Sequence, residues 1–234
     1  MRALEDLFDA IVGSTDVKHD ADTHGLVRNL VQRVAGWPVT SGHWSLRRTS
    51  GLAAVAVLHA QEVLQLVPEQ QRASNETALE LAELVFGGEC KPLPEVWAYA
   101  ASATADRAAS DVALSAGVAD RVDRAVAYAE RTDLSAVDRP HVVGYVATLA
   151  SVAACDSVAA AVASAWAAAA AYANADADAD VAVAKLWINK ADTFAVRAVV
   201  SAEAAAKAAK FSMSCDVVLP SFESVRVAIG IEVG

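Results

Sequence analysis

Cysteine is scarce in this sequence, and the common catalytic motifs are missing from it. The three cysteines, Cys90, Cys155 and Cys215, are widely spaced among 234 residues. An odd number without a Cys-x-x-Cys pair argues against a disulfide framework and a zinc site, so we expect a reduced, cytoplasmic protein. No nucleophile-elbow, zinc-protease, dinucleotide-binding or phosphate-loop motif occurs. The acidic N-terminal segment also lacks the basic start and apolar stretch of a signal peptide.

Basic residues are also few. Lysine and arginine number 19 against 29 aspartates and glutamates, which gives a net charge of −10. The densest basic spots, Arg47 with Arg48 and Lys207 with Lys210, are too small for a nucleic-acid groove, which requires clustered cations. We therefore expect no nucleic-acid partner. An acidic surface fits a basic protein partner, or simply serves solubility.

Large aromatic side chains are rare in this sequence. Only 6% of the residues are aromatic, although 55% are hydrophobic. Alanine dominates, and alanine is the best helix former, so the composition predicts an all-α fold. A core of alanine and valine must gain its contacts from close helix packing rather than from bulk. The expected core anchors are the few large aromatic residues, namely Trp37, Trp44, Trp97, Trp166, Trp187, Phe86, Phe194 and Phe211.

An internal repeat indicates how these helices are organised. Residues 97–113 return in altered form as residues 143–159, so that Tyr99 matches Tyr145, 46 positions later. Further matching segments are 78–83 with 125–130, 127–129 with 171–173, and 152–157 with 196–201. This period predicts stacked helix-hairpin repeats, either an α-solenoid-like stack or an irregular bundle. Alanine-rich helices can also resemble one another through composition alone.

Local signals place the expected helices. They span residues 2–12, about 22–35, 52–67, 76–86, a stretch around Trp97, the run from residue 142 onward, and 181–211. We expect a loop over residues 39–50, with Ser50 and Ser74 as helix caps. Gly117, Asp133 and Pro140 punctuate the chain between the later helices, and residues 174–180 form a linker.

The run over residues 142–174 is one helix or two, because no glycine or proline divides it, whereas the repeat predicts a break near residues 161–163. Residues 157–175 form an uncharged run that is long enough to suggest a membrane span. Because the run is mostly alanine and lacks Leu, Ile and Phe, which drive insertion, we expect a buried central helix and no membrane association.

The last residues change in character. Val225, Val227, Ile229, Ile231 and Val233 alternate with smaller or polar residues, which is typical of a β-strand. Residues 217–219 could pair with it as a short C-terminal β hairpin. Such a hairpin packs on the helical body or on a strand of another chain. The expected organisation is N-terminal helices and loop over 1–50, an Ala-rich helical-repeat body over 51–211 and the β-hairpin tail over 212–234.

One cluster has metal-binding chemistry. His19, Asp20, Asp22 and His24 place two imidazoles and two carboxylates within six residues, which suits a divalent ion such as zinc. The two carboxylates are equally natural helix caps, and no further ligand can be placed from the sequence. The acidic run over residues 176–180 lacks the glycine and glutamate of an EF-hand loop and fits a solvated linker.

Three segments of the sequence carry a resemblance to a known family. They are residues 59–67, 78–89 and 96–109. Together they resemble Ala-rich, all-helical immunity proteins found beside bacterial polymorphic toxins, over about residues 52–113 with an echo in 121–159. Arg72 and Ala73 stand where that family carries an Arg-Pro pair, its typical His-bearing helix is not evident, and no functional residue is carried over. The resemblance implies a cytoplasmic protein that binds and neutralises another protein without catalysis.

Three functions are consistent with the sequence. The first is a non-catalytic protein-binding module, such as a toxin-neutralising immunity protein. The second is a metal-dependent enzyme that uses His19, Asp20, Asp22 and His24. The third is a self-assembling structural protein that forms a homo-oligomer through its C-terminal strand. The sequence predicts no cofactor.

Overall fold

The computed structural model describes residues 42–86, 117–131, 134–135, 138–176 and 181–214. This part of the chain is almost entirely helical and contains no strand, which confirms the all-α prediction. In chain order its elements are α3 (Gly42–Glu62), the short 3-10 helix η2 (Leu64–Leu66), α4 (Glu69–Phe86), α6 (Val118–Ala129), α7 (Asp138–Asp176) and α8 (Val181–Ser214).

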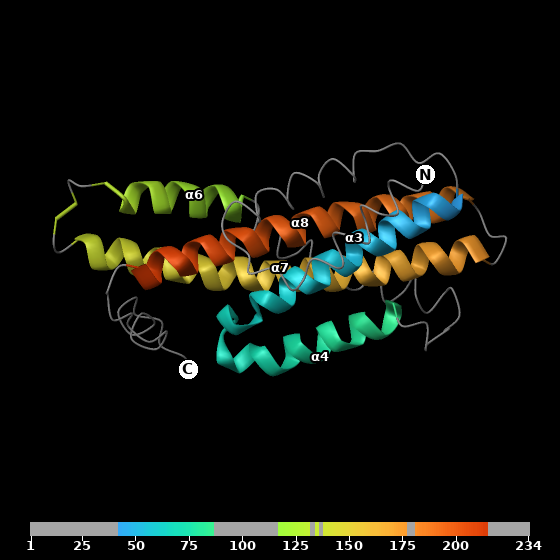
Figure 1. Ribbon diagram of the computed structural model, residues 1–234, viewed down its shortest axis with the longest axis horizontal. Helices are drawn as coiled ribbons and strands as arrows, with labels where there is room; N and C mark the ends of the chain where they lie inside the picture. Colours follow the sequence, from blue (N-terminus) through green and yellow to red (C-terminus); the bar gives the residue numbers. More distant parts are fainter. Residues whose placement is uncertain (1–41, 87–116, 132–133, 136–137, 177–180, 215–234) are drawn as a thin grey trace, which may run out of the picture.

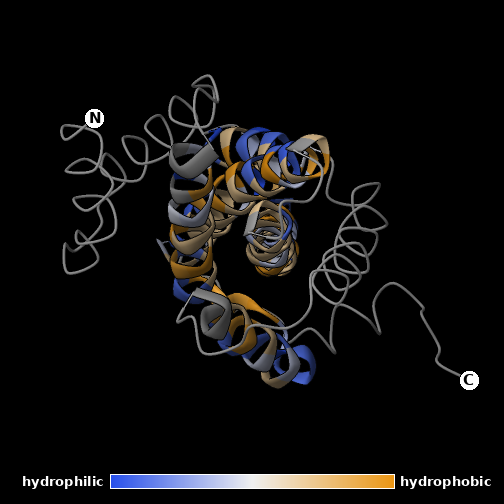
Figure 2. Cartoon of the chain, turned by 90° about the vertical axis from the view of Figure 1, so that its right-hand side faces the viewer, coloured by the Kyte–Doolittle hydropathy of each residue, from blue (hydrophilic) through white to orange (hydrophobic). Residues whose placement is uncertain are grey.

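The two longest helices, α7 and α8, form the centre of the bundle. They run side by side along its long axis and share its most extensive contact (Figure 1). Helix α3 packs on both of them, α6 lies beside the first part of α7, and α4 packs on α7 and α3. The view along the long axis shows the helices gathered around one another, with hydrophilic residues among the hydrophobic ones (Figure 2).

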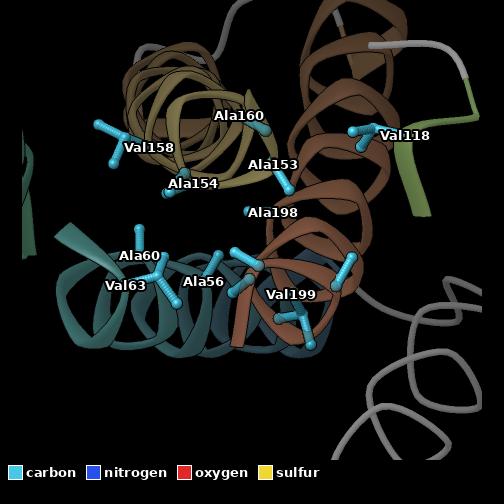
Figure 3. Close-up of a cluster of buried hydrophobic side chains, with 14 of the residues drawn as sticks. Ala56, Ala60, Val63, Val118, Ala153, Ala154, Val158, Ala160, Ala198 and Val199 are labelled. Atoms are coloured by element: carbon cyan, nitrogen blue, oxygen red, sulfur yellow. The ribbon is translucent and has the colours of Figure 1, made fainter. Parts of the chain in front are cut away.

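Small side chains fill the core. Ala153 of α7 points toward α8, whereas Ala154 points toward α3, where it meets Ala56 and Ala60 (Figure 3). All four are fully buried. Because alanine projects so little from the helix, the backbones can approach closely and gain contact area without large residues. The packing thus agrees with the close helix approach that the composition predicts.

Of the expected aromatic anchors, Trp187 is buried, and Trp166, Phe194 and Phe211 are half-buried. Trp166 packs against both hydrophobic clusters, and Phe211 against the larger one. Trp37 and Trp97, and the side chains of Trp44 and Phe86, lie outside the described part. Trp187 is thus a member of the smaller hydrophobic cluster, whereas the other three described anchors are only partly buried.

Buried hydroxyl groups connect the central helices. Ser157 of α7 donates a hydrogen bond to the carbonyl of Ala198 at 2.9 Å, and Ser164 donates to the carbonyl of Ala191 at 2.8 Å. Both serines are fully buried. Alanine surfaces alone would let two helices slide along each other at little cost, whereas a buried hydroxyl must keep its partner. These bonds therefore fix the register of α7 against α8.

The prediction of a loop over residues 39–50 is wrong from residue 42 onward, because α3 begins at Gly42. Ser50 is half-buried inside this helix and does not cap it. Ser45 and Thr49 are buried, so contacts with the rest of the bundle stabilise a segment whose polar composition suggested a loop. The boundary expected between residues 50 and 51 falls inside α3.

The predicted start of the next helix is also wrong. Helix α4 begins at Glu69, directly after Pro68, and Ser74 lies within it. The Ser74 hydroxyl donates to the carbonyl of Gln71 at 2.9 Å, as serines inside helices do. The N–H of Gln71 in turn donates to the carbonyl of Pro68 at 2.9 Å. Proline is compatible with a helix start, since it lacks only an N–H that would have no partner there.

Three predictions made from local sequence signals agree with the structure. Gly117 precedes α6 in the left-handed region, with φ of 74°, which favours glycine. Pro140 lies in the first turn of α7, where proline is tolerated. Helix α8 begins at Val181 and ends at Ser214, close to the predicted 181–211.

Residues 142–174 belong to one helix, and the break expected near residues 161–163 is absent from the 39-residue α7. Three buried residues occupy that position, Ala161, Val162 and Ala163, and strong helix formers packed on both sides give the helix no reason to end. The stacked-repeat arrangement stays a prediction, because Tyr99 lies outside the described residues while Tyr145 is exposed on α7. The C-terminal hairpin also lies outside them.

By length and composition, α7 could cross a membrane. It is the one such helix in the described part of the chain, with a mean hydropathy of 1.8 in its most apolar window, of which 67% is buried in the bundle. The core helix of a bundle meets the same criteria, so this feature is weak evidence for a membrane span.

Candidate functional site

The predicted metal ligands His19, Asp20, Asp22 and His24 lie outside the described residues, so the metal site stays a prediction. Within the described ranges, no group of three or more His, Cys, Asp or Glu residues could hold a metal ion. His59 is buried on α3, where its Nδ1 lies 3.3 Å from Glu62 Oε2.

A hollow of about 660 Å³ lies between α6 and the first turns of α7. We call it the α6–α7 groove, and its lining residues are Arg121, Arg124, Ala125, Tyr128, His141, Val142 and Tyr145. The four from α6 follow the spacing i, i+3, i+4 and i+7, which places them along one face of a helix. Those from α7 lie within its first two turns.

The local sequence explains why the two helices meet here. The apolar face of α6 is buried by the bundle, with Val122 and Val126 among its buried residues. The Ser135 hydroxyl accepts a hydrogen bond from the N–H of Asp138 at 3.0 Å and donates to its carboxylate at 2.6 Å. Serine in this arrangement stabilises a helix N-terminus. The bonds thereby stabilise the start of α7, which carries His141.

A further contact ties α6 to the bundle. Lys207 of α8 donates from Nζ to Asp123 Oδ1 at 2.7 Å. Both side chains are about half exposed, so the pair stabilises little by itself. Asp123 lies on α6 between the buried Val122 and Arg124 of the groove. Its contact with Lys207 therefore indicates that α6 has a defined orientation on the bundle.

Two tyrosines flank the groove and remain accessible. Tyr128 is 47% exposed and Tyr145 is 52% exposed, while Ala125, which also lines the groove, is buried. The guanidinium carbon of Arg131 lies 5.4 Å from the centre of the Tyr128 ring, within the range of a cation–π contact. Tyrosine and arginine are the residues that protein interfaces favour and that dominate their binding energy.

The groove is locally cationic. Its lining includes two arginines and a histidine, and no aspartate or glutamate. The described residues together carry 12 lysines and arginines against 13 aspartates and glutamates, so most of the net charge of −10 resides in the other segments. The acidity of the whole chain therefore does not describe this surface.

The structure also contains two buried ion pairs that sequence reasoning missed. Asp156 of α7 accepts from the guanidinium of Arg197 on α8, with Nε 3.2 Å from Oδ2, and from the Ser201 hydroxyl at 2.6 Å. The Asp156 side chain is almost fully buried. Its oxygens are engaged by groups from the neighbouring helix, so this carboxylate fixes the α7–α8 register.

The second pair joins α3 to α8. Asp192 is held by the guanidinium of Arg48 and by the Thr49 hydroxyl, which donates to Oδ1 at 2.8 Å. Burial raises the pKa of Asp192 above its ordinary value, although the Thr49 and Arg48 contacts oppose this shift. Since both pairs are surrounded by packed helices, they serve the fold, and the α6–α7 groove is the candidate functional site.

The tyrosines of the groove were visible in the sequence only as markers of the repeat. Tyr128 and Tyr145 lie 17 positions apart on different helices, and helix packing alone brings them together. The available signal was the row formed by Arg121, Arg124 and Tyr128, which follows helical spacing without being apolar.

The chain matches no family model, no curated protein and no solved structure. Its function therefore has to be inferred from the geometry and chemistry of the surface.

Proposed function

We propose that this protein is a non-catalytic protein-binding module that uses the α6–α7 groove as its contact surface. The observation that carries the proposal is the pair of half-exposed tyrosines, Tyr128 and Tyr145, beside a groove lined with arginine. A tyrosine offers a large, rigid contact area at a low cost in conformational entropy, and it can also hydrogen bond. Two of them beside arginines form a potential centre of binding energy.

The volume of about 660 Å³ alone would also accommodate a small molecule. The placement of the side chains favours a protein. Small-molecule pockets bury most of their ligand's surface, whereas this groove is formed by two helices and its tyrosines are half exposed. A partner that covers both tyrosines would bury much more apolar surface than a small ligand could.

The most specific form of this proposal is a cytoplasmic, toxin-neutralising immunity protein. It rests on the resemblance over about residues 52–113, of which the helices α3 and α4 are described. A toxin would be neutralised when its active surface is covered.

Affinity purification from the native host tests the proposal. The tagged protein is compared with the double variant Tyr128→Ala/Tyr145→Ala and with Tyr172→Ala as a matched control. Tyr172 is 48% exposed on the same helix α7 as Tyr145, but lies at its other end. We expect one partner that the wild type and the Tyr172 variant retain and that the double variant loses.

The double variant should keep the circular dichroism spectrum and melting temperature of the wild type, since both tyrosines project from the surface. The proposal is wrong if no partner is retained, or if the double variant retains the same partner as the wild type. For an immunity protein, expression of the retained partner alone should arrest growth, and co-expression of the wild type should restore it.

A further inference from the structure

We infer that the α6–α7 groove binds an acidic peptide segment of a protein partner, one that carries an apolar side chain between its carboxylates. This inference rests on the proposed function and specifies the chemistry of the partner at that site. It differs from the expectation of a basic partner, because that expectation follows from the charge of the whole chain rather than from this surface.

The polar groups that line the groove fit carboxylates. Arg124 is exposed, and its Nε donates to the carbonyl of Asp120 at 3.2 Å, which holds the side chain along α6. Its terminal nitrogens are donors of the type that binds carboxylates in bidentate fashion. Arg121 lines the groove one helical turn earlier, and the tyrosine hydroxyls can donate as well.

The lining also specifies what lies between the carboxylates. Ala125 and Val142 are the apolar residues of the groove, one from each helix. Ala125 is buried and Val142 is half-buried. A small residue in a groove that two tyrosines also line leaves room for one aliphatic or aromatic side chain of a ligand, and removal of such a side chain from water favours binding. A chain of charges alone would leave this part of the groove empty.

The same residues argue against a nucleic acid as the occupant. Binding along a phosphate backbone requires a stripe of many cations, whereas two arginines and one histidine line this groove. Asp120, which is exposed on the same helix, would repel a long polyanion, whereas a short peptide can place its carboxylates at the arginines.

The experiment measures the binding of labelled peptides to the full chain by fluorescence anisotropy. The probe is the pentapeptide Glu-Glu-Leu-Glu-Glu, and the comparison peptides replace every Glu by Gln, every Glu by Lys, or Leu by Gly. We expect the acidic peptide to bind about threefold to tenfold more tightly than the Gln peptide, because each pair that a carboxylate forms with an exposed arginine contributes less than about fivefold. Replacing its Leu should also weaken binding, and added salt should do the same.

Variants of the protein locate the site. Tyr145→Ala should weaken binding of the acidic peptide at least about fivefold, and Arg124→Gln should weaken it by up to about fivefold, because the exposed guanidinium forms a pair that solvent screens. The control for the lost charge is Lys185→Gln, which is exposed near the start of α8, and the control for the lost ring is Tyr172→Ala. Both controls should bind as the wild type does, and circular dichroism should be the same for all four variants.

Three results would overturn the inference. Equal binding of the Glu, Gln and Lys peptides with a loss in Tyr145→Ala would refute acidic specificity while leaving the groove as a protein-binding surface. Binding of the acidic peptide that neither groove variant weakens would place it elsewhere on the protein. Tighter binding of a short single-stranded oligonucleotide than of the acidic peptide would identify phosphate as the preferred anion. Failure of the proposed function is a different outcome. In that case, the double variant Tyr128→Ala/Tyr145→Ala still retains the host partner in the affinity purification.

Discussion

Replacement of Arg197 by methionine tests how strongly the buried Asp156 depends on its partner across the α7–α8 interface. The side chains of Asp156 and Arg197 are 3% and 20% exposed. Loss of one partner of a buried ion pair typically costs about 3–5 kcal/mol, because the remaining charge has no compensation. Since Ser201 still donates to Asp156, we expect the lower end, about 3 kcal/mol. That is a large part of a total stability of roughly 5–15 kcal/mol.

The assay is urea denaturation followed by circular dichroism. The double variant Asp156→Leu/Arg197→Met replaces both charges by apolar groups, so it should recover most of the loss. The control is Lys207→Met, which breaks an exposed pair whose two side chains are 52% and 55% exposed. Such a pair contributes less than about 1 kcal/mol.

Two results would refute this reasoning. If Arg197→Met costs no more than Lys207→Met, the guanidinium is not needed to compensate the buried carboxylate. If the double variant is less stable than Arg197→Met, the charge of Asp156 stabilises the core by itself, and the cost of an unpaired buried charge is not the cause of the loss.

Three further predictions concern glycine, core volume and pH. Gly144→Ala should raise the melting temperature, because Gly144 lies inside a helix and an added Cβ meets no atom within 4 Å. Gly117→Ala should instead lower the free energy of unfolding, measured by urea denaturation, by about 1–2 kcal/mol, because the φ of Gly117 is 74°. Equal effects of the two variants would contradict this prediction. Ala161→Leu in the fully buried core should lower the free energy of unfolding by about 1–3 kcal/mol or more. The control Ala127→Leu, on the exposed face of α6, should leave it nearly unchanged. If Ala161→Leu also leaves it unchanged, the core is loosely packed. Because the pKa of Asp192 is raised in the folded state, its titration stabilises the fold below the unfolded pKa, and this contribution is lost as the pH rises through the folded value. The free energy of unfolding of the wild type relative to Asp192→Asn should therefore fall as the pH rises above the ordinary aspartate pKa of 3.8 and through the raised folded value, and a rise would show that the pKa is lowered in the folded state.

The helical class and the later helix boundaries could be predicted because they depend on local chemistry. Gly117 and Pro140 mark the starts of α6 and α7 through their backbone preferences. The start of α3 could not be predicted in this way. Its first residues have the composition of a loop, and contacts with distant residues, such as Thr49 with Asp192, stabilise them as helix. The continuity of α7 through Ala161 likewise depends on burial from several sides.

The groove was harder to predict than the fold. Nothing in the local sequence distinguishes Tyr145 from a tyrosine that packs in the core, and its exposure follows from how α6 lies on α7. The buried ion pairs present the same difficulty, because Asp156 and Arg197 lie 41 positions apart. A pairing at that distance depends on the register of two alanine-rich helices, for which the sequence offers many nearly equivalent alternatives.

The position of α8 in the chain has a consequence for synthesis on the ribosome. Both buried ion pairs require a residue of this helix, and α3, α6 and α7 all pack against it. Until α8 has left the exit tunnel, Asp156 and Arg48 lack their partners, and the alanine faces of the earlier helices stay uncovered. The nascent chain therefore stays incompletely folded until α8 has emerged from the ribosome, and only then can the bundle form its full set of contacts.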